Sequence, residues 1–153
     1  MQPRPTDLAA MREAIVLARE AGAAGDIPIG ALVLDERNEV IARGMNRREV
    51  DHDPTAHAEV LALRAAAQAR GDWRLDGCTL VVTLEPCPMC AGAATMSRVD
   101  RLVFGAWNDE YGAAGSAWDL VRDRRLNHRL EVVGGVLAEE CGTLVREFLG
   151  GRR

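Results

Sequence analysis

Two short segments hold the side chains best suited to chemistry: "DPTAHAEV" contains His57 and Glu59, and "PCPMC" contains Cys87 and Cys90. A Cys-x-x-Cys pair at the start of a helix can form half of a metal site or act as a redox dithiol, and a plain pair of buried cysteines is the third possibility. Taken alone, this cysteine pair favours metal and redox chemistry about equally.

His57 favours the metal interpretation. Helices on the same side of one sheet can bring their first turns together, and His57, Cys87 and Cys90 would then offer a ligand set suited to Zn²⁺. Three protein ligands leave a fourth position for water, which is typical of a catalytic zinc. A redox protein would leave His57 and Glu59 without a role, although a lone histidine near a helix start is more often a cap or a core residue.

Glu59 distinguishes a catalytic zinc site from a structural one. It stands two residues after His57, so it need not bind the metal itself. A carboxylate beside a zinc-activated water can take the proton and deliver it to a substrate. Without zinc, Glu59 would be an ordinary solvent-facing helical glutamate. We therefore predict that Glu59 is the catalytic residue.

Apolar periodicity and turn residues predict alternating helices and strands around these segments. We expect Thr6 to cap the first helix, Asp53 to cap the second with Pro54 as its first residue, and Pro86 to open the third. The predicted helices span 6–22, 54–70, 87–97 and 138–149, and the predicted strands span 27–35, 39–44, 78–85, 101–106 and 130–137. This order predicts an α/β fold: a single three-layer domain over residues 1–153, with a central mixed five-stranded sheet and helices on both faces.

Composition and charge limit the class of protein. The chain has 153 residues, of which 48% are hydrophobic and 27% charged, as in ordinary globular domains. A general polyanion binder would be basic, whereas the net charge here is −4, so any nucleic-acid contact must be local. No apolar run approaches the ~20 residues that span a bilayer, and the N-terminus lacks the pattern of a secretory signal. We therefore expect a cytoplasmic protein with reduced cysteines, in which Cys78 and Cys141 belong to the core.

The order His-x-Glu and then Pro-Cys-x-x-Cys is the signature of zinc deaminases. Further segments extend the match from about Asp26 to Phe148, in the order "NR", "HDPTAHAE", "ALR", "TLEPC", "MCAGA", "VFGA", "GAAGS" and "NHR". Together they resemble the family of bacterial tRNA-specific adenosine deaminases. The resemblance implies a cytidine deaminase-like fold, a homodimer with one Zn²⁺ per subunit, and conversion of adenosine to inosine at the wobble position of a tRNA anticodon.

The matching motifs also imply roles for individual residues. They imply that His57, Cys87 and Cys90 bind zinc and that Glu59 moves protons. Asn46 would hydrogen-bond the flipped purine, because an amide can both donate and accept, although it could instead close its own loop. The base pocket would be lined by Ile27, Pro28, Ala58 and Leu84, and the flanking nucleotides would be contacted by Phe104, Asn108, Gly112, Ala113 and the C-terminal helix near Phe148.

The chain departs from the family pattern at Asn108, where the family often carries an aspartate. An aspartate can only accept from a ribose 2′-hydroxyl, whereas an amide can donate or accept, so this position bears on the choice of RNA over DNA. The local basic patch that the net charge requires could come from the arginines of "VRDRRLNHR", which could equally form a solvated surface: Arg122, Arg124, Arg125 and Arg129.

Two alternatives to a tRNA deaminase remain open from the sequence. A deaminase of free guanine or cytosine would share the zinc signature, because substrate range changes easily on one fold. A non-enzymatic, zinc-stabilised RNA-binding module would hold zinc and bind tRNA without releasing ammonia.

Overall fold

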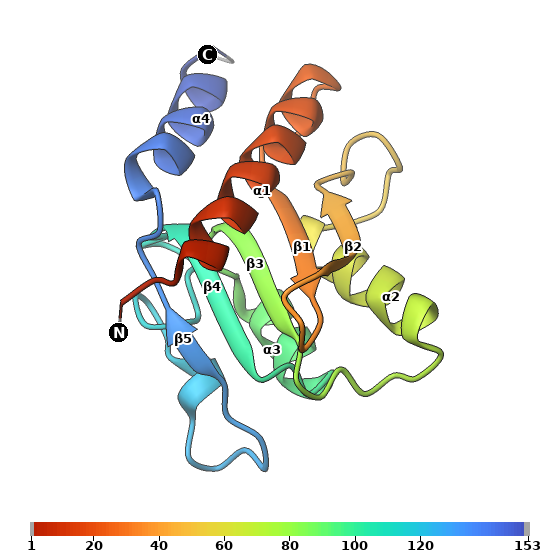
Figure 1. Ribbon diagram of the computed structural model, residues 1–153. Coiled ribbons are helices and arrows are strands. Elements are labelled where there is room, and N and C mark those ends of the chain that lie inside the picture. The colour runs from red at the N-terminus through yellow and green to blue at the C-terminus, as the bar shows by residue number, and fades with distance from the viewer. Residues whose placement is uncertain (1, 152–153) are drawn as a thin grey trace.

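Five strands form one mixed sheet in the order β2-β1-β3-β4-β5 in the computed structural model, which describes residues 2–151 (Figure 1). β1 runs antiparallel to both β2 and β3, while β3, β4 and β5 are parallel. The strands are β1 (Gly30–Leu34), β2 (Val40–Met45), β3 (Thr79–Leu84), β4 (Arg101–Ala106) and β5 (Glu131–Val133). The predicted mixed five-stranded α/β fold is confirmed, although β5 is shorter than the predicted 130–137.

Helices cover both faces of the sheet (Figure 1). They are α1 (Pro5–Ala23), α2 (Ala58–Arg70), α3 (Pro88–Met96) and α4 (Ala138–Gly150), with a short 3₁₀ turn η1 (Leu120–Arg122). None of the helices within residues 2–151 is long and apolar enough to cross a membrane.

Alternation along the central strands separates two apolar cores. Val81 and Val103 pack on the face covered by α1 and α4, whereas Leu80, Val82 and Phe104 pack on the face covered by α2 and α3. All five side chains are fully buried. The central strands are therefore apolar on both faces, which explains their continuous apolar sequence.

The start of α2 differs from the prediction. The helix begins at Ala58, and His57 is its N-cap with an extended backbone. Asp53 instead accepts hydrogen bonds from the amide and hydroxyl of Thr55, both at 2.8 Å, in a local turn. Asp53 therefore does not cap α2, and Pro54 is not its first residue, because Asp53 lies five residues before Ala58 and its carboxylate is already engaged by Thr55.

Proline residues set the starts of α1 and α3, because proline needs no partner for its nitrogen in the first turn. α1 begins at Pro5, so Thr6 lies inside the helix and is not its cap. α3 begins at Pro88 rather than after Pro86, and Cys87 is its N-cap. The revised boundaries place His57 and Cys87 at equivalent positions of two helices.

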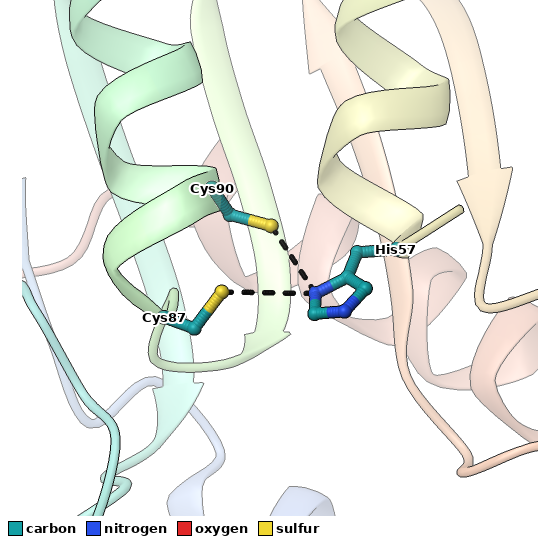
Figure 2. A group of neighbouring side chains, drawn as sticks. All are labelled: His57, Cys87 and Cys90. Atoms are coloured by element: carbon teal, nitrogen blue, oxygen red, sulfur yellow. Dashed lines mark hydrogen bonds between the residues drawn. The ribbon is translucent and has the colours of Figure 1, made fainter. Parts of the chain in front are cut away.

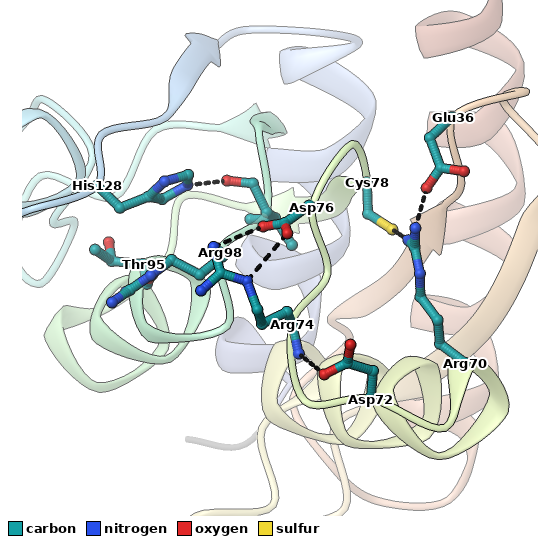
Figure 3. Close-up of polar contacts among 10 residues, drawn as sticks. Glu36, Arg70, Asp72, Arg74, Asp76, Cys78, Thr95, Arg98 and His128 are labelled. Atoms are coloured by element: carbon teal, nitrogen blue, oxygen red, sulfur yellow. Dashed lines mark hydrogen bonds and ion pairs between the residues drawn. The ribbon is translucent and has the colours of Figure 1, made fainter.

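Arginine side chains tie together the end of the sheet where β3 begins (Figure 3). Arg70 donates to the sulfur of Cys78 at 2.6 Å and pairs with Glu36, and Arg74 pairs with Asp76 at 3.0 Å. Cys78 is fully buried, as predicted, and so is Cys141 on the opposite face of the sheet. The exposed ion pairs contribute little stability individually, so this end of the molecule is held mainly by its buried side chains.

α2 lies unusually close to β2 at Gly44. A Cβ atom added there would stand 2.4 Å from the carbonyl oxygen of Ala58 and 2.8 Å from the amide nitrogen of Ala62. Only glycine fits such an approach of helix backbone to strand. The first turn of α2 is thus seated directly on the strand.

We expect Gly44→Ala to destabilise the protein by about 1–3 kcal/mol, as overpacking does elsewhere, and to weaken zinc binding because the start of α2 must shift. Thermal unfolding and metal content measure both effects. Gly150→Ala at the end of α4 is the matched control: its added Cβ meets no atom within 4 Å, so helix propensity should leave it neutral or slightly more stable. A Gly44→Ala protein with wild-type stability and zinc content would contradict this account.

Candidate active site

The first turns of α2 and α3 meet at one edge of the sheet. β2 and β3 both run antiparallel to β1, so their carboxyl ends lie at the same edge, and each leads through a loop into its helix. His57 caps α2, Cys87 caps α3 and Cys90 follows in the first turn of α3. Their side chains point toward one another (Figure 2), with all ligand atoms within 4.8 Å. The predicted trio is brought together.

The spacing of these atoms fits zinc. His57 Nδ1 lies 3.7 Å from Cys87 Sγ and 3.4 Å from Cys90 Sγ. Tetrahedral zinc with ordinary bond lengths places its nitrogen and sulfur ligands about 3.5 Å apart. Two sulfurs and an imidazole nitrogen are also the donors that zinc prefers. The residues therefore fit a zinc ion that keeps one position for another ligand.

The two thiols differ in acidity. Cys90 donates a hydrogen bond to the sulfur of Cys87, and His57 lies beside the same sulfur. The pKa of Cys87 therefore falls to about 4. The same hydrogen bond raises the pKa of Cys90, and the contact with Cys87 raises the pKa of His57. A thiolate is the form that binds metal, so Cys87 is ready to act as a ligand at neutral pH.

Glu59 is buried beside the ligand trio. Its side chain is 4% exposed, and burial raises its pKa to about 7 from the usual 4.5. A carboxyl group with a pKa near the working pH can both take and return a proton. Its place beside the metal ligands, without being one of them, gives Glu59 the features of a general acid–base.

An open pocket of about 950 Å³ leads to these residues. This volume is at the upper end of the range for small-molecule sites, roughly 300–1,000 Å³. Predicted residues that line it are His57, Glu59, Cys87, Ile27, Leu84 and Asn108. Two of the three zinc residues, the candidate acid–base and part of the predicted substrate set thus face one cavity.

Other predicted substrate residues do not line this pocket. Phe104 is fully buried and packs edge-on against Trp107, with ring centroids 4.8 Å apart. A nucleotide contact by Phe104 is therefore wrong, because its side chain belongs to the core beneath α2 and α3. Pro28 and Ala58 are also buried outside the pocket lining.

Asn46 has the alternative role foreseen for it. Its amide donates to the carbonyl oxygen of Ile27 and accepts from the amide of Arg48, both at 3.4 Å. These long contacts close the loop that leaves β2. The side chain is nearly buried, so its contact with a purine stays a prediction.

The four arginines that could form a basic patch do not line the pocket. The segment 123–130 leads into the amino end of β5, whereas the pocket lies at the carboxyl ends of the parallel strands β3 and β4. Arg122 and Arg125 pair with Asp119 and Asp123. The cations that do line the pocket, which the sequence did not single out, are Arg48 and Arg146. Glu85, Trp107 and Tyr111 also line it and were missed.

Comparison with known proteins identifies the family. Residues 4–106 match the family model of the cytidine and deoxycytidylate deaminase zinc-binding region. The chain belongs to this deaminase family. The family match and the ligand trio together make the protein a zinc-dependent deaminase.

Among the proteins similar to this deaminase are tRNA adenosine deaminases and a guanine deaminase. A tRNA-specific adenosine deaminase of Bacillus subtilis (strain 168) is 51% identical over 138 residues, which cover 90% of this chain and 85% of that protein. A solved structure described as A-to-I editing by tRNA:A34 deaminases at the wobble position of transfer RNA has a TM-score of 0.85 and 39% identity, covering 89% of this chain and 98% of the other. A guanine deaminase from Nitrosomonas europaea has a TM-score of 0.82 and 30% identity, covering 98% and 87%.

Cys90→Ala should abolish zinc binding and deamination, because the remaining pair of ligands holds the ion too weakly. Elemental analysis of the purified protein measures the metal content. Cys141→Ala is the matched control, since Cys141 is equally buried but lies on the other face of the sheet, and it should retain zinc. A Cys90→Ala protein with full zinc occupancy would refute the ligand assignment.

Glu59→Ala should keep zinc and fold but lose at least about 100-fold in kcat, the usual contribution of a general acid–base. Turnover, zinc content and thermal unfolding are measured on the same sample. Glu20→Ala, an exposed glutamate on α1, should behave as wild type. An active Glu59→Ala enzyme would show that the proton moves through another group.

Proposed function

We propose that the deaminase converts adenosine to inosine at the wobble position of a tRNA anticodon. The observation that carries the proposal is the placement of the buried Glu59 beside the trio of His57, Cys87 and Cys90, at the base of a wide open pocket. The 51% identity to a tRNA-specific adenosine deaminase supports the choice of substrate.

Residues of this chain supply the steps of proton transfer. When bound, zinc provides Lewis-acid activation of a water molecule. The Glu59 carboxylate takes a proton from the attacking water and delivers it to the purine ring nitrogen. It then moves the remaining proton of the added hydroxyl to the amine, so that the C6–N bond breaks, ammonia leaves and a C6 carbonyl remains. Ile27 and Leu84 on the pocket wall offer apolar contact to the flipped base.

A folded RNA suits the pocket better than a free base. The cavity of about 950 Å³ extends from the ligand trio to side chains of α4, among them Arg146 and Leu149. A single base fills only part of such a space, whereas an anticodon loop brings unpaired neighbours that unstack at low cost. Deamination of free guanine is the second candidate, favoured by the similarity to a guanine deaminase.

We further infer that the enzyme is a homodimer that works in the cytoplasm, where tRNA is processed. Met89 and Met96 stand on the same face of α3 and are both exposed. An exposed apolar face of this kind is suited to burial against a second copy.

We expect the zinc-loaded protein to form inosine at the wobble adenosine of an anticodon stem-loop and to release no ammonia from free adenosine, guanine or cytosine. Nucleoside analysis of digested RNA and an ammonia assay are run in parallel, and sedimentation of the same sample reports its oligomeric state. If only a free base is deaminated, that base and not tRNA is the substrate. Binding of zinc and RNA without any deamination would favour the non-enzymatic alternative.

A further inference from the structure

A single buried carboxylate organises the loop 107–118 that follows β4. Glu85 directly follows β3 and is 1% exposed. Its Oε1 accepts from the amide of Asn108, and its Oε2 accepts from the amides of Ala114 and Ser116, all at 3.0 Å. The hydroxyl of Ser116 donates to the same carboxylate. Hydrogen bonds to an ionised acceptor are stronger than neutral ones, so Glu85 fixes both ends of this turn.

The loop closes around Glu85 without spare room. A Cβ atom added at Gly112 would stand 2.4 Å from the Glu85 carboxyl group and 2.4 Å from the carbonyl oxygen of Asn108. The amide of Ala113 also donates to the carbonyl oxygen of Pro86 at 2.8 Å. The loop is thus attached to the segment that leads to Cys87, although its own side chains are not zinc ligands.

This loop presents aromatic side chains to the pocket. Trp107 is 51% exposed and Tyr111 is 62% exposed, and both line the cavity that contains His57 and Glu59. The indole of Trp107 is held in place from below, because its edge contact with Phe104 is perpendicular and its ring lies close to Gly134, where a Cβ would stand 3.0 Å away. Trp107 is therefore a pre-positioned aromatic surface.

Charge around the pocket points to stacking as the mode of recognition. Asp109, Glu110 and Glu139 line the cavity together with Arg48 and Arg146, so carboxylates outnumber guanidinium groups there. Neutralising phosphates cannot supply most of the affinity at such a surface. Stacking of bases on aromatic rings does not depend on the charge balance and accepts any base.

We propose that Trp107 and Tyr111 form a stacking subsite for unpaired nucleotides beside the reacting base, and that Glu85 is the positioning residue of the loop that carries them. The inference rests on the proposed function, because it assigns to this pocket an RNA substrate with unpaired neighbours. It adds a subsite on residues that are not among the zinc ligands.

Kinetics on the anticodon stem-loop test the proposal. Trp107→Ala and Tyr111→Ala should each raise KM at least about fivefold, the lower range of one lost base stack, with kcat and zinc content close to wild type. Glu85→Gln and Ser116→Ala should raise KM in the same direction. Ser116→Ala disturbs the carboxylate from the loop side only, so it separates loop position from any effect on the nearby Cys87.

Trp73→Ala is the matched control. Trp73 is 59% exposed, stacks near Arg74 and follows the far end of α2, about 20 Å from the first turn that carries Glu59. The KM of the Trp73→Ala variant should equal that of the wild type. An unchanged KM in both loop variants, or an equal rise in Trp73→Ala, overturns the subsite, as does a change of oligomeric state that accounts for the lost affinity.

Direct RNA binding separates this proposal from the proposed function. Titration of the zinc-loaded protein with the stem-loop gives a Kd whether or not inosine forms. RNA that binds without being deaminated refutes the proposed function, and the subsite then stands only if Trp107→Ala and Tyr111→Ala raise that Kd. A wild-type protein that does not bind the RNA refutes both.

Discussion

The chemistry of this deaminase depends on two strands that end at the same edge of one sheet. β2 and β3 flank the antiparallel β1, so their exits lie together and the helices that follow begin side by side. His57 and Cys87 each occupy the N-cap of such a helix. At a cap, the backbone is still extended while the next residue is already fixed in the helix, so the side chain leaves a rigid element in a defined direction. The close packing of the first turn of α2 against Gly44 fixes the position of this helix on the sheet.

Different parts of the site stand on different kinds of structural element. His57, Glu59, Cys87 and Cys90 stand at the first turns of helices, whereas many of the other residues that line the pocket stand on loops and on α4. Helices packed on a sheet hold atoms to the tolerance that reaction geometry demands. A loop can change its side chains without disturbing that geometry, which is consistent with a guanine deaminase and tRNA deaminases sharing the same architecture.

Sequence reasoning succeeded where a signal is local and failed where it is not. Branched apolar runs and the Cys-x-x-Cys spacing identified the strands and the zinc residues, because each pattern is complete within a few positions. The start of α2 was misplaced because the Asp53 carboxylate accepts hydrogen bonds from Thr55 and not from the amides of the helix. Both kinds of partner are close in sequence, so the sequence does not distinguish them. Phe104 was misassigned because a motif match does not say which way a strand residue faces. Glu85 gave no signal because its hydrogen-bond partners are 23 to 31 residues away.

The position of the ligands also gives the metal a mechanical role. His57 and Cys87 are 30 residues apart and belong to different helices, so an ion held by both is a cross-link that closes the intervening chain into a loop. Cross-links of this kind restrict the unfolded chain, and any ligand that binds only the native state shifts the folding equilibrium by mass action. The free energy of unfolding therefore rises with the concentration of free zinc, so that loss of the metal weakens the fold as well as the activity.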